Sequence, residues 1–323
     1  MTAAELTYLI FGIVIVAALV FDLGLISKSN KKVTIKQALY QTIFWVSLAL
    51  GFFVFMWIYD SRLMAISYLS AYLMEWSLSI DNIFVFILIF SSFSVKAKHY
   101  GRVLLLGILM AIVFRVIFIT VGVALVERFH WILYGFGAFL VYTGNRMFFA
   151  DGNDEFDPVH SKVYKFLKKF LPLASHDGNG KFIVREKGKR LYTTLFLVVI
   201  MLACIDLVFA LDSIPAVMGI STNRMVIYTS NIFALLGLRS LFFLLRSAIS
   251  KFDYLQQGIA IVLVIIGLKM LLEHWIEPYV GKNAQVFISL GVIIVCLSGS
   301  MIYSRFRLRA GYPADAEDEE SEE

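Results

Sequence analysis

Two apolar stretches of this sequence each carry a pair of acidic side chains six positions apart, and a polar residue follows the second acid of each pair. These residues are Glu75, Asp81 and Asn82 in the first stretch, and Asp206, Asp212 and Ser213 in the second. Acids within membrane-spanning segments are costly, and they usually serve a function. Carboxylate, amide and hydroxyl oxygens are hard ligands that suit Mg²⁺, Ca²⁺ or Mn²⁺. The sequence therefore predicts a cation site between two related halves of the chain.

Helical geometry separates the two acids of each pair. The first acid and the polar residue after the second acid are seven positions apart, so they share one helical face. On a straight helix, a six-residue separation leaves the two acids roughly 120° and roughly 9 Å apart. Two arrangements stay open: both acids line one broad cleft, or the helix is unwound between them, as Pro215 would allow in the second stretch.

The composition indicates a polytopic membrane protein. Of the 323 residues, 59% are hydrophobic and only 16% are charged, whereas soluble domains are nearer about 45–50% apolar and about 25% charged. The net charge of +5 does not indicate a nucleic-acid partner, because the Lys and Arg residues lie in short segments between apolar stretches, as membrane topology requires.

Nine apolar stretches are long enough to cross roughly 30 Å of hydrocarbon, so we expect an all-α protein with nine transmembrane helices. They lie near residues 6–26, 38–59, 65–93, 103–126, 131–149, 192–218, 226–247, 255–275 and 284–304. Alternate loops, together with the C-terminal segment, hold 21 Lys and Arg residues, and the other loops hold four. The positive-inside rule then places the N-terminus outside and the C-terminus in the cytoplasm.

Internal similarity predicts that helices three to five and helices six to eight are two copies of one unit. Arg115 aligns with Arg239, and a motif of glycine, any residue, a basic residue and methionine recurs at Gly144 and Gly267. Because each unit has an odd number of helices, the second copy crosses the membrane in the opposite sense, as in transporters built from inverted repeats.

At membrane depth the acids outnumber the basic residues, which favours a cation over an anion as ligand. The acids are Asp22, Glu75, Asp81, Asp206 and Asp212, and the basic residues are Arg115, Arg239 and Lys269, which we expect to act as counter-ions. The same groups could instead form salt bridges that only stabilise the bundle. The equivalent placement of four acids in two repeats favours a binding site. Among small residues, Gly219 and Gly237 are expected to permit close helix contacts.

The regions outside the spans are short, apart from residues 150–190. Residues 158–170 predict an amphipathic helix on the cytoplasmic leaflet, and residues 181–193 predict a short hairpin. The acidic segment 310–323 is expected to be disordered. The transmembrane transporter domain would therefore comprise residues 1–309.

The cysteine content does not favour thiol chemistry. Only Cys204 and Cys296 are present, in separate apolar stretches and without a C-x-x-C motif. No catalytic motif and no resident cofactor are expected.

Three sequence motifs are similar to the signature segments of the TerC family of integral membrane proteins, and the length and the hairpin-bearing loop are similar to its Alx branch. The motifs are Glu75-x5-Asp81-Asn82, Asp206-x5-Asp212-Ser213-Ile-Pro-Ala and Thr229-Ser-Asn231-Ile-Phe-Ala-Leu-Leu-Gly-Leu-Arg239. The resemblance implies manganese export. It also implies a metal pathway formed by Asp22, Glu75, Asp81, Asn82, Asp206, Asp212, Ser213 and Asn231.

We therefore expect a nine-helix exporter in the bacterial inner or plasma membrane. It would move Mn²⁺ or a similar divalent cation by alternating access, and protons that compete for the same carboxylates could be exchanged for the metal. The alternative is a non-transporting redox or stress-response scaffold of the tellurite-resistance type.

Overall fold

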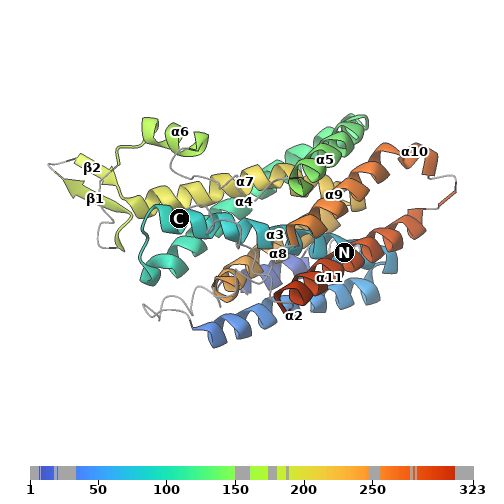
Figure 1. Ribbon diagram of the computed structural model, residues 1–323, viewed down its shortest axis with the longest axis horizontal. Coiled ribbons are helices and arrows are strands. Elements are labelled where there is room, and N and C mark those ends of the chain that lie inside the picture. Colours follow the sequence, from blue (N-terminus) through green and yellow to red (C-terminus); the bar gives the residue numbers. More distant parts are fainter. Residues whose placement is uncertain are drawn as a thin grey trace, which may run out of the picture.

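Long helices that run side by side make up most of the molecule (Figure 1). The structure is a computed structural model that describes residues 7, 9–17, 20, 34–149, 161–173, 180–186, 189–246, 255–276, 279–280 and 282–309. Its long helices are α2 (Ile35–Tyr59), α3 (Arg62–Ser92), α4 (Tyr100–Arg128), α5 (Ile132–Phe148), α7 (Thr194–Ile220), α8 (Arg224–Leu245), α9 (Leu255–Leu271) and α11 (Lys282–Arg309). The short elements are η1 (Ala97–His99), α6 (Lys162–Phe170), α10 (Glu273–Ile276) and strands β1 (Ile183–Glu186) and β2 (Lys189–Tyr192).

The helices are those of a polytopic membrane protein, as the composition predicts. Among the described residues, six helices are long and apolar enough to cross a membrane by length and composition. They are Ile35–Tyr59, Arg62–Ser92, Ala97–Arg128, Thr194–Ile220, Arg224–Leu245 and Ala284–Ser304. Helices α5 and α9 are shorter, with 17 residues each. Most of the first expected span, 6–26, and the acidic segment 310–323 lie outside the described residues.

Local signals set where several helices begin. At the start of α2, Thr34 Oγ1 accepts a hydrogen bond from the Gln37 amide while Gln37 Oε1 accepts one from the Thr34 amide, which satisfies two amides that the helix leaves without partners. At the start of α8, Asn223 Oδ1 accepts from the Met225 amide. Both acidic stretches lie on unbroken helices, and Pro215 lies inside α7 without ending it.

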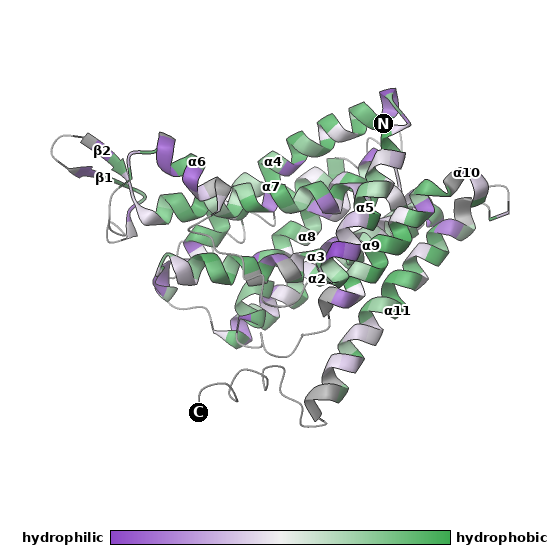
Figure 2. Cartoon of the chain, turned by 45° about the horizontal axis from the view of Figure 1, so that its top comes forward, coloured by the Kyte–Doolittle hydropathy of each residue, from purple (hydrophilic) through white to green (hydrophobic). Residues whose placement is uncertain are grey.

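The central helices are those that carry the acidic stretches and their partners. Helix α3 packs against α8 and α7, α4 packs against α7 and α8, and α5 packs along α9. Helices α2 and α11 lie outside this group and expose many large apolar side chains. Apolar residues predominate along the long helices, and hydrophilic residues lie on α6, on the hairpin and at several helix ends (Figure 2).

Glycines allow the closest helix contacts. A Cβ on Gly137 of α5 would lie 2.9 Å from the Gly267 carbonyl oxygen of α9, and a Cβ on Gly144 would lie 2.8 Å from the Ala260 carbonyl oxygen. Gly219 permits a close contact as expected, since a Cβ there would lie 2.6 Å from Ile266 Cγ2. The expectation for Gly237 is wrong, because the nearest atom would be 3.8 Å away, an ordinary contact distance.

The segment between α5 and α7 contains α6 and an antiparallel hairpin of β1 and β2, in which Ile183 pairs with Tyr192. Helix α6 places Tyr164 and Leu167 against the core and leaves Phe166 exposed. The α6 and hairpin segments lie together at one end of the bundle, opposite α10 (Figure 1).

Candidate functional site

A buried cluster at the meeting point of α3, α4, α7 and α8 centres on the guanidinium of Arg115. Its Nη1 donates to Glu75 Oε2 at 2.5 Å and to Asn231 Oδ1 at 2.9 Å. On the other side, Nε and Nη2 donate to the two carboxylate oxygens of Asp206 at 3.3 and 3.2 Å. The arginine and both acids are at most 2% exposed. One cation therefore bridges the first acid of each predicted repeat.

The four helices bring these side chains together because each of them has at least one buried polar or charged residue on its inward face, and one from each helix reaches this cluster. Asn231 is fully buried and its Nδ2 donates to the Ile227 carbonyl one turn earlier, which directs its carbonyl oxygen toward Arg115. A buried polar group is costly unless it is hydrogen-bonded. The need to hydrogen-bond these buried side chains therefore favours a packing in which the four helices meet at this point.

Two oxygens at the edge of this cluster are left without hydrogen-bond partners. Among the described residues, neither Glu75 Oε1 nor Ser213 Oγ has a hydrogen-bond partner, and both atoms are buried. The Ser213 hydroxyl lies close enough to the Glu75 carboxyl to act on it as a hydrogen-bond donor, although the two groups do not have the geometry of a full hydrogen bond in this conformation. Buried polar atoms without partners are rare in proteins, and they often mark a place for an ion or a water molecule.

The second acid of the α7 stretch points elsewhere. Asp212 Oδ1 accepts a hydrogen bond from Thr143 Oγ1 of α5 at 3.3 Å, and the carboxylate is only partly buried. The angular separation on an unbroken helix explains why it does not join Asp206. Thr143 was not among the predicted residues. A single threonine in an apolar span carries no signal, although it directly precedes the Gly144 motif.

The remaining predicted residues have the following positions. Asn82 and Arg239 are buried on α3 and α8, and Lys269 Nζ on α9 donates to the Gly219 carbonyl at 2.9 Å and to Ser289 Oγ at 3.2 Å. Asp81 lies on α3, but its side chain is outside the described part of the structure, as is all of Asp22. The roles of Arg239 and Lys269 as counter-ions stay predictions.

The described residues contain no group of three or more His, Cys, Asp or Glu side chains placed to hold a metal ion. In this conformation the carboxylates of Glu75 and Asp206 are instead occupied by Arg115.

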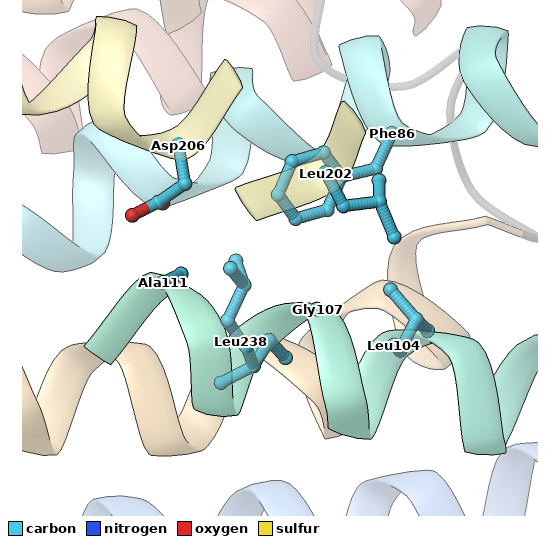
Figure 3. Close-up of a pocket in the computed structure, with 8 residues that line it drawn as sticks. Phe86, Leu104, Gly107, Ala111, Leu202, Asp206 and Leu238 are labelled. Carbon is cyan, nitrogen blue, oxygen red and sulfur yellow. The ribbon is translucent and has the colours of Figure 1, made fainter. Parts of the chain in front are cut away.

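A narrow gap adjoins the cluster between α4 and α7. It is lined by Phe86, Leu104, Gly107, Ile108, Ala111, Leu202, Asp206 and Leu238, and it is too tight to admit a water molecule. Figure 3 shows Asp206 on one side of this gap and Leu104, Gly107 and Ala111 of α4 on the other. Close packing of Gly107 against Leu202, with 3.1 Å between a Cβ built on the glycine and the leucine Cβ, closes the gap beyond the acid.

Comparison with known proteins assigns the family. Residues 60–311 match the family described as integral membrane protein TerC family. The chain belongs to the TerC family. The matched region contains every residue of the Arg115 cluster and the whole of helices α3 to α11.

Several relatives resemble the chain over nearly its whole length. An uncharacterized membrane protein of Myxococcus xanthus is 39% identical, over 94% of this chain and 93% of the relative. A protein of Escherichia coli K12, named as a candidate membrane-bound redox modulator, Alx, is 36% identical over 93% of this chain and 96% of the relative. An uncharacterized membrane protein of Rickettsia felis is 36% identical over 94% of this chain and 98% of its own length. No solved structure matches the chain.

Proposed function

We propose that this TerC-family protein exports a hard divalent cation, with Mn²⁺ as the foremost candidate, from the cytoplasm by alternating access. The observation that carries the proposal is the convergence of Glu75 and Asp206, from two separate acidic stretches, on one buried point with Asn231 and Ser213 beside it. These groups supply oxygen ligands of the kind that Mn²⁺ and Mg²⁺ prefer. Acids at the interface between transporter repeats are a common form of ion site.

The same proposal includes nine spans and two inverted three-helix repeats, α3–α5 and α7–α9. If α3 corresponds to α7 and α4 to α8, the packing of α3 on α8 and that of α4 on α7 are equivalent contacts. The alignment that pairs Gly144 with Gly267 also pairs Gly137 with Ala260. A two-fold rotation that exchanges the two repeats would turn the contact of Gly137 with Gly267 into a contact of Ala260 with Gly144. The structure has both contacts. This packing supports the repeat relation.

We place the protein in the bacterial inner or plasma membrane with the N-terminus outside and the C-terminus in the cytoplasm, because Lys and Arg are concentrated in alternate loops. The segment that carries α6 and the hairpin would then be cytoplasmic. Its exposed Lys165, Lys168 and Lys169 beside Phe166 suit the surface of an anionic leaflet.

The experiment that tests the proposal is metal uptake into liposomes. The purified full chain is reconstituted with a Mn²⁺-sensitive dye inside, and uptake is compared for the wild type, Glu75→Gln, Asp206→Asn and the surface control Glu127→Gln. We expect Glu75→Gln and Asp206→Asn to abolish uptake, and Glu127→Gln to retain it, because Glu127 pairs with Arg224 in solvent-exposed positions. Absence of uptake by the wild type, or wild-type uptake by both site variants, would contradict the proposal.

The second candidate is a redox role, because relatives carry the name of a candidate redox modulator. Cys204 and Cys296 are its only thiols; both are free and partly buried, on α7 and α11. A redox protein of this type would depend on one of them, whereas the proposed exporter would not.

A further inference from the structure

Arg115 occupies the oxygens that a metal ion would need. Its nitrogens donate hydrogen bonds to both carboxylate oxygens of Asp206, to Glu75 Oε2 and to Asn231 Oδ1. Among the described residues, that leaves Glu75 Oε1 and Ser213 Oγ, which lie near each other, as the oxygens of the cluster without a hydrogen bond. Hard divalent cations take about six or more oxygen ligands, so two free oxygens beside a bound guanidinium are too few for tight binding.

Building on the proposed function, we propose that the guanidinium of Arg115 is a resident cation that holds the divalent-ion site when it is empty and is displaced when the ion binds. The formal charges agree with such an exchange. With Glu75 and Asp206 ionised, the cluster carries one net negative charge while Arg115 is in place, and two once it leaves, which a divalent cation neutralises. Two cations a few ångströms apart in a low-dielectric site repel each other strongly, so the arginine and the ion exclude one another.

The space around the cluster links this exchange to helix movement. On α4, Ala111 lies one turn before Arg115, and side chains on a helix lean toward its N-terminus, so a displaced guanidinium would move toward the gap between α4 and α7. That gap is too tight for a water molecule, and Gly107 packs closely on Leu202 beyond it. The guanidinium therefore fits only if α4 and α7 separate. Arrival of the ion would thus favour a conformation in which these two helices have moved apart.

The exchange also gives the protein a way to release its ion. A site with two buried carboxylates and no resident cation would bind a divalent ion tightly and release it slowly. Return of the Arg115 guanidinium to Glu75 and Asp206 would replace the ion's contacts with both carboxylates, so that the empty site is not left with two unpaired buried charges, which are costly.

Titration of purified full-length protein with Mn²⁺, with free Mn²⁺ followed by electron paramagnetic resonance, tests this inference. We expect Arg115→Gln to lower the Kd for Mn²⁺ at least tenfold, because no tethered cation competes for the carboxylates. Turnover in the liposome assay should fall, because the ion is not expelled. Arg224→Gln is the matched control: it removes an arginine from an exposed ion pair with Glu127, and we expect the wild-type Kd and wild-type uptake.

Arg115→Lys covers the case in which Arg115→Gln does not fold. It keeps a positive charge but loses the paired donors that reach both oxygens of Asp206, so we expect a Kd two- to fivefold below that of the wild type. Adding Asp206→Asn to either variant should remove the gained affinity. An unchanged or raised Kd in the Arg115 variants would overturn the inference. Wild-type Mn²⁺ uptake measured in the same preparation shows separately whether the proposed function holds.

Discussion

Gly137 of α5 and Gly267 of α9 face each other so closely that a Cβ on Gly137 would lie 2.9 Å from the Gly267 carbonyl oxygen, and one on Gly267 would lie 2.7 Å from the Gly137 carbonyl oxygen. The two helices therefore meet backbone to backbone at this point. Helices in a membrane gain little from burying apolar surface against each other, so close packing through small residues is a main source of their association.

We predict that Gly137→Ala destabilises the protein by about 2 kcal/mol, in the range for overpacked positions, because the new methyl group would meet a backbone oxygen that cannot move aside easily. Gly135→Ala on the same helix is the matched control. Beyond its own helical turn, no atom of the described residues lies within 4 Å of its Cβ position, and alanine favours helix, so it should be neutral or stabilising by up to about 1 kcal/mol. Thermal unfolding of the two variants in detergent measures the difference, and equal melting temperatures would contradict the packing described for α5 and α9.

The second prediction separates stability from function at the two acids of α7. Asp206→Asn removes one partner of a buried ion pair and should destabilise the protein by about 3 kcal/mol. Asp212→Asn should cost much less, since its carboxylate is partly exposed and makes one hydrogen bond, with Thr143. We expect both variants to lose metal resistance in cells, with Asp212→Asn still present in the membrane in normal amounts. Wild-type resistance in both would leave the acids with a purely structural role.

Part of this site could be predicted from the sequence. The acidic stretches are visible because carboxyl groups stand out in apolar segments, and Arg115 is a plausible counter-ion because it is the only basic residue in its span. The sequence could not show that Glu75 and Asp206 share this one arginine while Asp212 turns to Thr143. Two acids that lie roughly 120° apart on a helix can line one broad cleft, or they can face two different sets of neighbours. The packing of the neighbouring helices decides which arrangement forms.

The fold, like the site, could be predicted from the sequence only in part. Hydropathy located the long helices because a span needs a minimum length of apolar sequence, and the structure has helices at those positions throughout its described residues. Glycine contacts were harder to predict. Gly219 and Gly237 look alike in the sequence, yet Gly219 lies against Ile266 and Met270, whereas Gly237 has only Trp45 at 3.8 Å. The difference depends on which face of each helix meets a neighbour.

The third prediction concerns thiols. The double variant Cys204→Ser/Cys296→Ser should export Mn²⁺ at the wild-type rate and confer wild-type metal resistance, because neither thiol contacts the Arg115 cluster in the described hydrogen bonds. Growth in Mn²⁺ and uptake into liposomes are the measurements. Loss of resistance by the double variant, together with normal amounts of protein in the membrane, would favour the redox role.

The fourth prediction concerns topology. A reporter fused after Glu323 should be active only in the cytoplasm, because most Lys and Arg residues lie in the loops assigned to that side. A reporter inserted between α4 and α5, after Phe129, should report the outside. The reverse pattern would contradict the orientation, and the same compartment for both would contradict an odd number of helices between them.

The last prediction is that Mn²⁺ binding weakens as the pH falls. A carboxylate binds a metal ion only when it is deprotonated, so protons and Mn²⁺ compete for the same oxygens of Glu75 and Asp206, and metal binding releases the protons that these carboxylates hold at a given pH. Lowering the pH therefore raises the concentration of the competitor and raises the Kd for Mn²⁺. The affinity should be highest on the alkaline side and should fall toward acid pH.

Titrating purified protein with Mn²⁺ across the acid-to-neutral range, in weakly buffered solution with a pH indicator, measures the Kd and the released protons together. Glu75→Gln leaves one carboxylate fewer to be protonated, so it should bind Mn²⁺ more weakly and release fewer protons per ion. If the binding of Mn²⁺ is tight, independent of pH and without proton release, the ion does not exchange with protons at these carboxylates. Export would then be driven by the electrochemical gradient of Mn²⁺, and an imposed pH difference across the liposome membrane would leave the uptake rate unchanged.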